Sequence, residues 1–282
     1  MSAKDDRLVL TDLRGRKAFW EGVMWGMNLG NINECESDFT DFDGDTRIIG
    51  GQDAREGFAI YQVSIRKQYK NKEFHWCGGS IIHEEWVLTA GYCTYGIGAK
   101  ELPIVVGSTQ LKSGGDRYNI TKIIIHEEYS QERLKNNIAL MKVDGKIKMK
   151  NNVMPIKLRK EPVAARTICA LTGWGYIDNQ GTMPNKLQIL FFKSISNKNC
   201  NEQLKRSNFA PIDDKQLCVR GPDKKGACLG DSGGPLVAFD SNYGVVQVGI
   251  VSWGTFPCAQ NYPEVFSSVS SYYDWIEKNM KD

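Results

Sequence analysis

From about residue 60 onward, the apolar positions of the chain form short runs rich in Val, Ile, Leu and Phe, separated by turn-forming residues. Short strands at such regular spacing favour an antiparallel β-sandwich or barrel over a parallel α/β sheet. The expected strands are residues 62–66, 79–82, 86–89, 104–107, 120–125, 139–143, 168–172, 187–192, 234–238 and 247–253.

The two ends of the chain depart from this pattern. Near the C-terminus, Tyr272, Tyr273, Ile276 and Met280 recur at helical spacing, which predicts a short helix packed on the β structure. Residues 1–47 are polar or irregular and include an acidic stretch at 38–45. We therefore expect an irregular leader or pro-segment before a single β-rich unit that starts at residue 48.

The composition of the 282 residues narrows the possible functions. Lys and Arg number 36 against 33 for Asp and Glu, and a net charge of only +3 gives no indication of a nucleic-acid partner. No apolar run approaches the roughly 18 residues that a membrane span needs. The sequence also contains no pattern that predicts a metal site or a cofactor.

The 8 cysteines are widely scattered and lack the paired spacing of a zinc site. Such scatter is typical of disulfides formed in an oxidising compartment, which predicts secretion. No signal peptide is evident, because residues 4–7 are all charged and Glu21 interrupts the mixed stretch 18–29. The alternatives are a degenerate internal signal, an irregular leader, or a start site assigned too far upstream.

Residues 226–235, Gly-Ala-Cys-Leu-Gly-Asp-Ser-Gly-Gly-Pro, place Ser232 in a glycine-rich turn. Glycine suits Gly233 and Gly234, because a tight turn with a close backbone approach leaves no room for a side chain. A serine hydroxyl is a weak nucleophile at neutral pH and needs a neighbouring base, usually an imidazole. The chain has only 3 histidines, at positions 75, 83 and 126.

A series of motifs follows in order along the chain: RIIGG at 47–51, WCGGS at 76–80, WVLTAGYC at 86–93, NIAL at 137–140, TGWG at 172–175, GDSGGP at 230–235 and SWG at 252–254. In this order they resemble the chymotrypsin/trypsin-like serine protease family from residue 48 to the C-terminus. The segment 258–266 is most similar to arthropod chymotrypsin-like members. The resemblance implies an all-β fold of two six-stranded antiparallel barrels with the active site in the cleft between them. The barrels are expected at about 48–146 and 165–270, joined by a linker, with the C-terminal helix at about 271–281.

Carried over residue by residue, Ser232 matches the family's nucleophile, and the N–H groups of Gly230 and Ser232 match its oxyanion hole. The position of the catalytic histidine is Tyr92, and that of the buried aspartate is Asn137. A phenol has a pKa near 10, so only about one in a thousand is ionised at pH 7. We expect the Tyr92 ring to fill the volume of the imidazole against Ser232, with Asn137 hydrogen-bonded to it.

None of the three histidines is expected to replace the missing base. The resemblance places His75 near the aspartate that precedes the nucleophile. Polar neighbours predict that His83 and His126 lie at the surface.

The resemblance also implies a zymogen. A trypsin-like protease would cut after Arg47, and the freed amine of Ile48 would pair with Asp231 to shape the oxyanion hole and the specificity pocket. We expect this cut to change a binding surface instead of starting catalysis.

The family's specificity pocket maps to Gly226 at its floor and to Ala227 and Gly254 on its walls, which predicts an open apolar slot for an aromatic or leucine side chain. Glu264 occupies a position that is usually glycine. It either narrows the slot or offers a carboxylate to a basic side chain. The apolar preference is favoured, and a basic preference and a closed pocket are the alternatives.

Cys35 and Cys169 have no counterpart among the family disulfides, because the usual partner position of Cys169 is Ala238. We predict that they pair and tether the pro-segment, with free thiols or a partner on another chain as alternatives. The bridges that the resemblance implies are Cys77–Cys93, Cys200–Cys218 and Cys228–Cys258.

Two classes of function are left. Loss of the base and its orienting group favours a non-catalytic protease homologue, a secreted monomer that binds a protein or peptide in the cleft as cofactor, decoy or scaffold. Retention of Ser232, Gly230 and Asp231 favours a serine endopeptidase with severely reduced chymotrypsin-like activity. In a secreted chain, Asn119 of Asn-Ile-Thr is a candidate glycosylation site.

Overall fold

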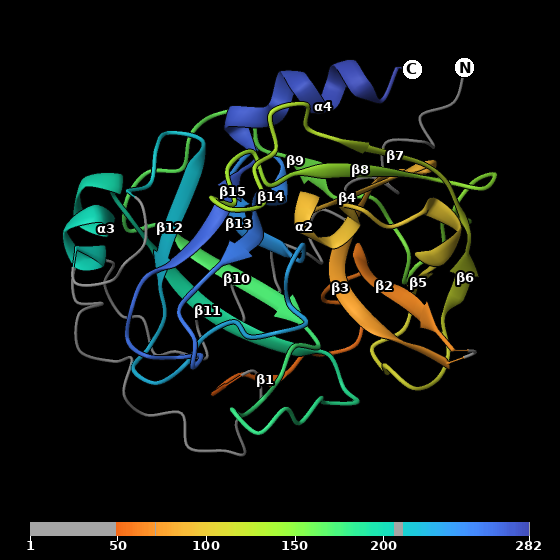
Figure 1. Ribbon diagram of the computed structural model, residues 1–282, viewed down its shortest axis with the longest axis horizontal. Helices are drawn as coiled ribbons and strands as arrows, with labels where there is room; N and C mark the ends of the chain where they lie inside the picture. Colours follow the sequence, from red (N-terminus) through yellow and green to blue (C-terminus); the bar gives the residue numbers. More distant parts are fainter. Residues whose placement is uncertain (1–48, 71, 206–210, 282) are drawn as a thin grey trace, which may run out of the picture.

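The computed structural model describes residues 49–70, 72–205 and 211–281. Two sheets, antiparallel apart from one short parallel pairing of β9 (Lys157–Leu158) with β14 (Gly244–Trp253), lie side by side (Figure 1). Short helices accompany them: α2 (Gly91–Thr94), α3 (Asn197–Leu204), α4 (Tyr273–Asn279) and the 3₁₀ turns η1 (Ala99–Glu101) and η2 (Ser270–Tyr272).

The first half forms a curled sheet with the strand order β6-β5-β2-β3-β4-β8-β7. Its inward positions, such as Val63, Ile65 and Leu88, are completely buried in one apolar core. The strands are β2 (Gln62–Tyr69), β3 (Lys72–His83), β4 (Trp86–Thr89), β5 (Ile104–Val106), β6 (Asp116–Tyr118), β7 (Ile120–Ile125) and β8 (Ala139–Val143).

The second half closes into a six-stranded barrel. The order β11-β10-β13-β14-β15-β12 returns to β11 where Ser194 pairs with Val219. Two short strands add to this barrel, β1 (Gln52–Asp53) beside β11 and β9 (Lys157–Leu158) beside β14. The barrel strands are β10 (Ile168–Gly173), β11 (Gln188–Ile195), β12 (Gln216–Arg220), β13 (Pro235–Asp240), β14 (Gly244–Trp253) and β15 (Glu264–Ser268).

The predicted all-β, chymotrypsin-like fold is confirmed, and each expected strand is present close to its predicted bounds, except that the strand predicted at 79–82 already begins at Lys72. The second barrel is the closed six-stranded ring that was expected. In the first sheet, the pairings of the described residues run from β6 to β7 without one that closes the ring. Strands β12 (QLCVR) and β15 (EVFSS) were not predicted, and each gains the other as a partner only in the folded barrel.

The predicted C-terminal helix is also confirmed. Tyr272 and Ile276 are buried in the core of the first sheet, and Trp275 and Met280 pack against that core. Helix α3 was not predicted. It begins at Ser196, whose hydroxyl accepts the N–H of Asn199 at 3.2 Å, and it buries Cys200 and Leu204 one turn apart.

Buried hydrogen bonds join the two halves. Ser80 Oγ donates to Gln247 Oε1 at 2.7 Å, and Thr172 Oγ1 donates to Gln62 Oε1 at 2.6 Å. These bonds hold the first sheet against the closed barrel along the line where the candidate site lies. Over its described residues, the chain contains no helix with both the length and the hydropathy that a membrane crossing requires.

Candidate functional site

Ser232 lies in the turn before β13, at the junction of the two sheets. Its carbonyl accepts the N–H of Gly78 at 2.8 Å, and the turn closes with the N–H of Gly234 on the carbonyl of Asp231 at 2.9 Å. Gly233 has φ +79°, and a Cβ on it would lie 2.2 Å from Thr89 Oγ1. Position 233 therefore requires glycine, both for its left-handed backbone and for its approach to the first sheet.

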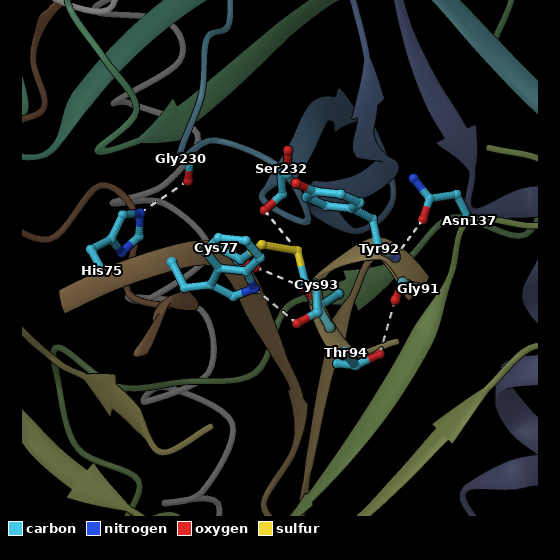
Figure 2. Close-up of a disulfide and its surroundings, with 12 residues drawn as sticks. His75, Cys77, Gly91, Tyr92, Cys93, Thr94, Asn137, Gly230 and Ser232 are labelled. Atoms are coloured by element: carbon cyan, nitrogen blue, oxygen red, sulfur yellow. Dashed lines mark hydrogen bonds between the residues drawn. A yellow bond between two sulfur atoms is a disulfide. The ribbon is translucent and has the colours of Figure 1, made fainter. Parts of the chain in front are cut away.

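The main-chain N–H groups of Gly230 and Ser232 were predicted to form the oxyanion hole. Within the described ranges, neither N–H has a hydrogen-bond acceptor, which leaves both available to an anionic ligand. The carbonyl of Gly230 is held by His75, whose Nε2 lies 3.0 Å from it (Figure 2). This contact restricts rotation of Gly230, whose φ of +102° few other residues tolerate.

His75 is a structural partner of this turn. Its Nδ1 lies 2.7 Å from Ser64 Oγ, and its ring meets the edge of Trp174 with the centroids 5.8 Å apart. Burial lowers the pKa of His75 to about 4, so the imidazole is neutral at pH 7. The resemblance placed His75 near Asp231, and its contact is with the residue immediately before that aspartate.

Asp231 is buried beneath the turn. Its two carboxylate oxygens accept the N–H groups of Gly175 at 2.8 Å and Cys228 at 3.0 Å. Burial raises its pKa to about 6 in spite of these two hydrogen bonds. The carboxyl would therefore gain from a cationic partner. The predicted partner, the amine of Ile48, lies outside the described residues, as does Arg47. The adjoining Ile49 is described, and its carbonyl accepts the N–H of Gly226 at 3.0 Å.

Tyr92, which the resemblance places at the position of the family's histidine, lies on the short helix α2 (Figure 2). Its ring stacks on Trp76, with the centroids 5.9 Å apart and the planes 24° apart, and 41% of the side chain is exposed. Among the residues described, the phenol makes no hydrogen bond to Ser232. The stacking on Trp76 was not predicted, and the placement of the ring in the volume of the imidazole against Ser232 stays a prediction.

Asn137, which the resemblance places at the position of the family's aspartate, is almost fully buried. Its Oδ1 accepts the main-chain N–H of Tyr92 at 2.9 Å, and its Nδ2 donates to Ser252 Oγ at 2.9 Å. The expected hydrogen bond between Asn137 and Tyr92 is thus present, but it is made to the backbone. The amide satisfies both neighbours without placing a charge in the junction.

The other two histidines lie away from Ser232. His83 is exposed, as predicted. The prediction of a surface position for His126 is wrong, since only 8% of it is exposed and its ring is stacked on Trp275, with the centroids 5.2 Å apart. Burial lowers the pKa of His126. The polar sequence neighbours of His126 gave no indication of this burial, because the ring is covered by the C-terminal helix, which is distant in the sequence.

The predicted specificity-pocket residues are brought together. The Oε1 of the half-buried Glu264 accepts the N–H of Ala227 at 2.8 Å, and it lies 2.1 Å from the place where a Cβ on Gly226 would be. The Glu264 side chain also passes Gly254, where an added Cβ would lie 3.9 Å from its Cγ. Loss of hydration, opposed by the Ala227 N–H and reinforced by the nearby charge of Asp231, raises the pKa of Glu264 to about 8.

The three disulfides implied by the resemblance are present. Cys169 is buried and unpaired within the described residues, and it lies opposite Ala238 in the β10–β13 register. Burial raises the pKa of its thiol to about 12. Cys35 lies outside the described residues, so its pairing with Cys169 stays a prediction. The bridges are Cys77–Cys93, Cys200–Cys218 and Cys228–Cys258.

Sequence reasoning missed three residues that shape this site. Ser252 accepts a hydrogen bond from the side-chain amide of Asn137, and Ser64 is hydrogen-bonded to His75. Trp76 stacks on the ring of Tyr92. Ser252 and Trp76 both belong to the motifs that identify the family. The sequence therefore showed that these residues belong to the ordered motifs of the resemblance, whereas only the structure shows their side-chain contacts.

Comparison with known proteins agrees with this geometry. The family model described as Trypsin matches residues 48–276. Trypsin-1 of Astacus astacus is 37% identical over 240 residues, covering 82% of this chain and 99% of the relative. Chymotrypsin-2 of Vespa crabro is 38% identical over 233 residues, again covering 82% and 99%. Trypsin Blo t 3 of Blomia tropicalis is 36% identical over 238 residues, covering 82% and 85%. With these matches and the chymotrypsin-like fold, this chain belongs to the trypsin family of chymotrypsin-like serine proteases.

Proposed function

We propose that this protein is a serine protease homologue that has lost catalysis and binds a protein or peptide segment in the cleft between its two barrels. The observation that carries the proposal is the surroundings of Ser232. In the described part of the chain, its hydroxyl has no hydrogen-bonded base, and Tyr92, at the base position, stacks on Trp76. Asn137, at the orienting position, is a neutral amide.

The expected loss of rate is large. In serine proteases of this mechanism, replacing the aspartate by asparagine costs about 10⁴ in turnover, and losing the base costs about as much as losing the whole triad, about 10⁶. The turn and the oxyanion hole would retain a rate about 10³–10⁴-fold above that of the reaction in water. A protein with this rate serves better as a binding partner than as a peptidase.

The alternative is a serine endopeptidase with severely reduced chymotrypsin-like activity. It is favoured by the unengaged N–H groups of Gly230 and Ser232 and by the hydrogen bond that holds the Gly230 carbonyl on His75. These features are the electrostatic part of a working site. They contribute little without a group that removes the proton of Ser232.

Labelling with a fluorophosphonate probe separates the two functions. The intact protein and the protein cut at Arg47 are treated beside a Ser232→Ala control and a Tyr92→His/Asn137→Asp rescue variant. We expect labelling of the wild-type protein at the level of Ser232→Ala, and rapid labelling of the rescue variant. Rapid labelling of the cut wild-type protein would establish the endopeptidase instead.

We also propose that residues 1–47 are a pro-segment and that a trypsin-like protease cuts after Arg47. This proposal is supported by Asp231. Its buried carboxyl has a raised pKa and would be stabilised in its charged form by the Ile48 amine. Secretion is supported by the three disulfides, and Asn119 of the sequon is exposed. Mass spectrometry of the native protein tests the cut, and an intact Arg47–Ile48 bond with no trace of cleaved chain would contradict it.

For the specificity pocket we propose a narrowed slot that takes a leucine or aromatic side chain at neutral pH. A carboxyl with a pKa of about 8 is mostly protonated at pH 7, so Glu264 offers little charge to a basic side chain. In the rescue variant, substrates with Leu or Phe before the scissile bond should be cut faster than one with Arg at pH 7. Faster cleavage after Arg would assign the basic preference.

A further inference from the structure

Aromatic side chains line an open cavity beside Tyr92, on the side of the first sheet. The cavity has a volume of about 320 Å³ and is lined by Lys67, Trp76, Tyr92, Tyr95, Ile97 and Tyr129, which together are called the aromatic pocket below. Two ring pairs build it, Tyr92 on Trp76 and Tyr95 against Tyr129, with the centroids of the second pair 5.4 Å apart. The volume lies at the lower end of the roughly 300–1,000 Å³ of ligand sites, so one aromatic side chain suits it.

The aromatic pocket opens next to the nucleophile turn. Tyr92 precedes Cys93, whose sulfur lies 3.4 Å from the carbonyl oxygen of Ser232 (Figure 2). Tyr92 and Tyr95 expose 41% and 53% of their side chains. Exposed tyrosines beside a tryptophan are typical of the residues that carry binding energy in protein interfaces. A partner held in the cleft can therefore reach this pocket.

The rim of the aromatic pocket is cationic. Lys67 Nζ lies 4.5 Å from the centroid of the Trp76 ring, and no carboxylate of the described chain forms an ion pair with it. The hairpin between β2 and β3, which carries Lys67, also exposes Lys72. Its one acidic residue, Glu73, forms an ion pair with Arg117. A ligand with carboxylates beside its aromatic ring would complement this charge.

We propose that the aromatic pocket binds an aromatic side chain flanked by acidic residues in a segment of a partner protein. The inference rests on the proposed binding function and specifies the chemistry of the partner. The ring would enter between Tyr92 and Tyr95, and a neighbouring carboxylate would meet Lys67. Replacement of the histidine by a stacked tyrosine thus turns a catalytic position into one wall of a recognition site.

Fluorescence anisotropy tests this proposal with a labelled peptide, Gly-Ser-Glu-Glu-Phe-Glu-Glu-Ser-Gly. Two control peptides replace Phe by Ala or every Glu by Lys. The protein variants are Lys67→Glu, Tyr95→Ala and, as the matched charge control, Lys198→Glu on the exposed face of α3 in the other barrel. Lys67→Gln keeps the test usable if Lys67→Glu does not fold.

We expect the acidic phenylalanine peptide to bind at least tenfold tighter than either control peptide. Lys67→Glu and Tyr95→Ala should each weaken it about tenfold, while Lys198→Glu keeps the wild-type affinity. Equal binding of all three peptides, or equal weakening by Lys67→Glu and Lys198→Glu, would overturn the proposal. A wild-type protein that forms a dimer and binds no peptide would also overturn the proposal if Tyr95→Ala dissociates the dimer. A second copy of the chain would then fill the pocket. Binding seen only after release of residues 1–47 would support the proposal, because the cut at Arg47 is expected to change a binding surface.

The same titration on Ser232→Ala separates this inference from the proposed function. The pocket proposal requires an affinity for the peptide equal to that of the wild-type protein, whether or not Ser232 reacts. Fluorophosphonate labelling of Ser232 would count against the loss of catalysis without changing the anisotropy result.

Discussion

The side-chain oxygen of Asn137 accepts the main-chain N–H of Tyr92 at 2.9 Å, so the two residues that the resemblance places at the orienting and base positions are hydrogen-bonded to each other. The amide nitrogen of Asn137 donates to Ser252 Oγ. Both polar ends of this buried side chain are satisfied without a charge. The two replacements therefore form a consistent pair, and restoring only one of them should be costly.

Restoring the base alone should give a poor enzyme. Tyr92→His in the protein cut at Arg47 is expected to turn over about 10⁴-fold more slowly than Tyr92→His/Asn137→Asp, because Asn137 cannot stabilise the imidazolium. Steady-state hydrolysis of a chromogenic peptide measures the ratio, with Ser232→Ala in both backgrounds as the blank. Equal rates in the two variants would show that the carboxylate is dispensable at position 137.

Restoring the carboxylate alone should destabilise the protein. At pH 7, Asn137→Asp is expected to lower the free energy of unfolding by about 2–4 kcal/mol, because it buries a charge with no cation to pair with it. Urea denaturation measures the loss, which should shrink at acid pH and when Tyr92→His is added. An undiminished stability at pH 7 would mean that Ser252 and the Tyr92 N–H suffice to hold the carboxylate.

Glu264 should make the stability depend on pH. Its pKa is raised from 4.5 to about 8 in the folded chain, so its contribution is fully present below pH 4.5 and is lost as the pH rises through 8. Relative to Glu264→Gln, the wild-type protein should lose stability between these two pH values and show no further change above them. Urea denaturation from pH 4 to 9 measures the difference, with the exposed Glu132→Gln as the matched control. A constant difference between wild type and Glu264→Gln would show that the carboxyl titrates normally.

His75 should affect the catalytic rate by positioning Gly230 and not by serving as a general base. In the rescue variant Tyr92→His/Asn137→Asp, His75→Ala is expected to lower kcat about 10- to 100-fold with little change in KM, because the Gly230 carbonyl loses its partner and the oxyanion hole loosens. The shape of the pH profile should stay the same, since His75 is neutral over the working range. A shifted profile would assign it a role in proton transfer.

Tyr129→Phe should not weaken the fold. The Tyr129 hydroxyl is buried and has no hydrogen-bond partner among the described residues, and burial raises its pKa to about 12. Removing an unsatisfied buried hydroxyl should leave the stability unchanged or raise it by about 1 kcal/mol. Thermal unfolding measures the change, with the ring packing against Tyr95 preserved. A loss above about 1 kcal/mol would reveal a partner for the hydroxyl.

Much of the fold was predictable because its signals are local. Runs such as 139–143 and 168–172 are mostly apolar along a strand, and the turn at Gly233 needs a residue without Cβ. Strands β12 and β15 escaped prediction because neither run has a clear alternation of its own. They pair with each other over residues 216–219 and 264–267, and this contact exists only after the barrel has closed.

The sequence by itself determined the family, because its signals are residue types within short motifs, and the resemblance implied the three disulfides that the structure contains. The tertiary structure decided where the side chains point. The Tyr92 ring stacks on Trp76, the His126 ring packs against the C-terminal helix, and the Glu264 side chain fills the space beside Gly226. Each of these contacts joins residues that are distant in the chain. A rotamer is selected by its packing partners, and only the folded molecule brings those partners together.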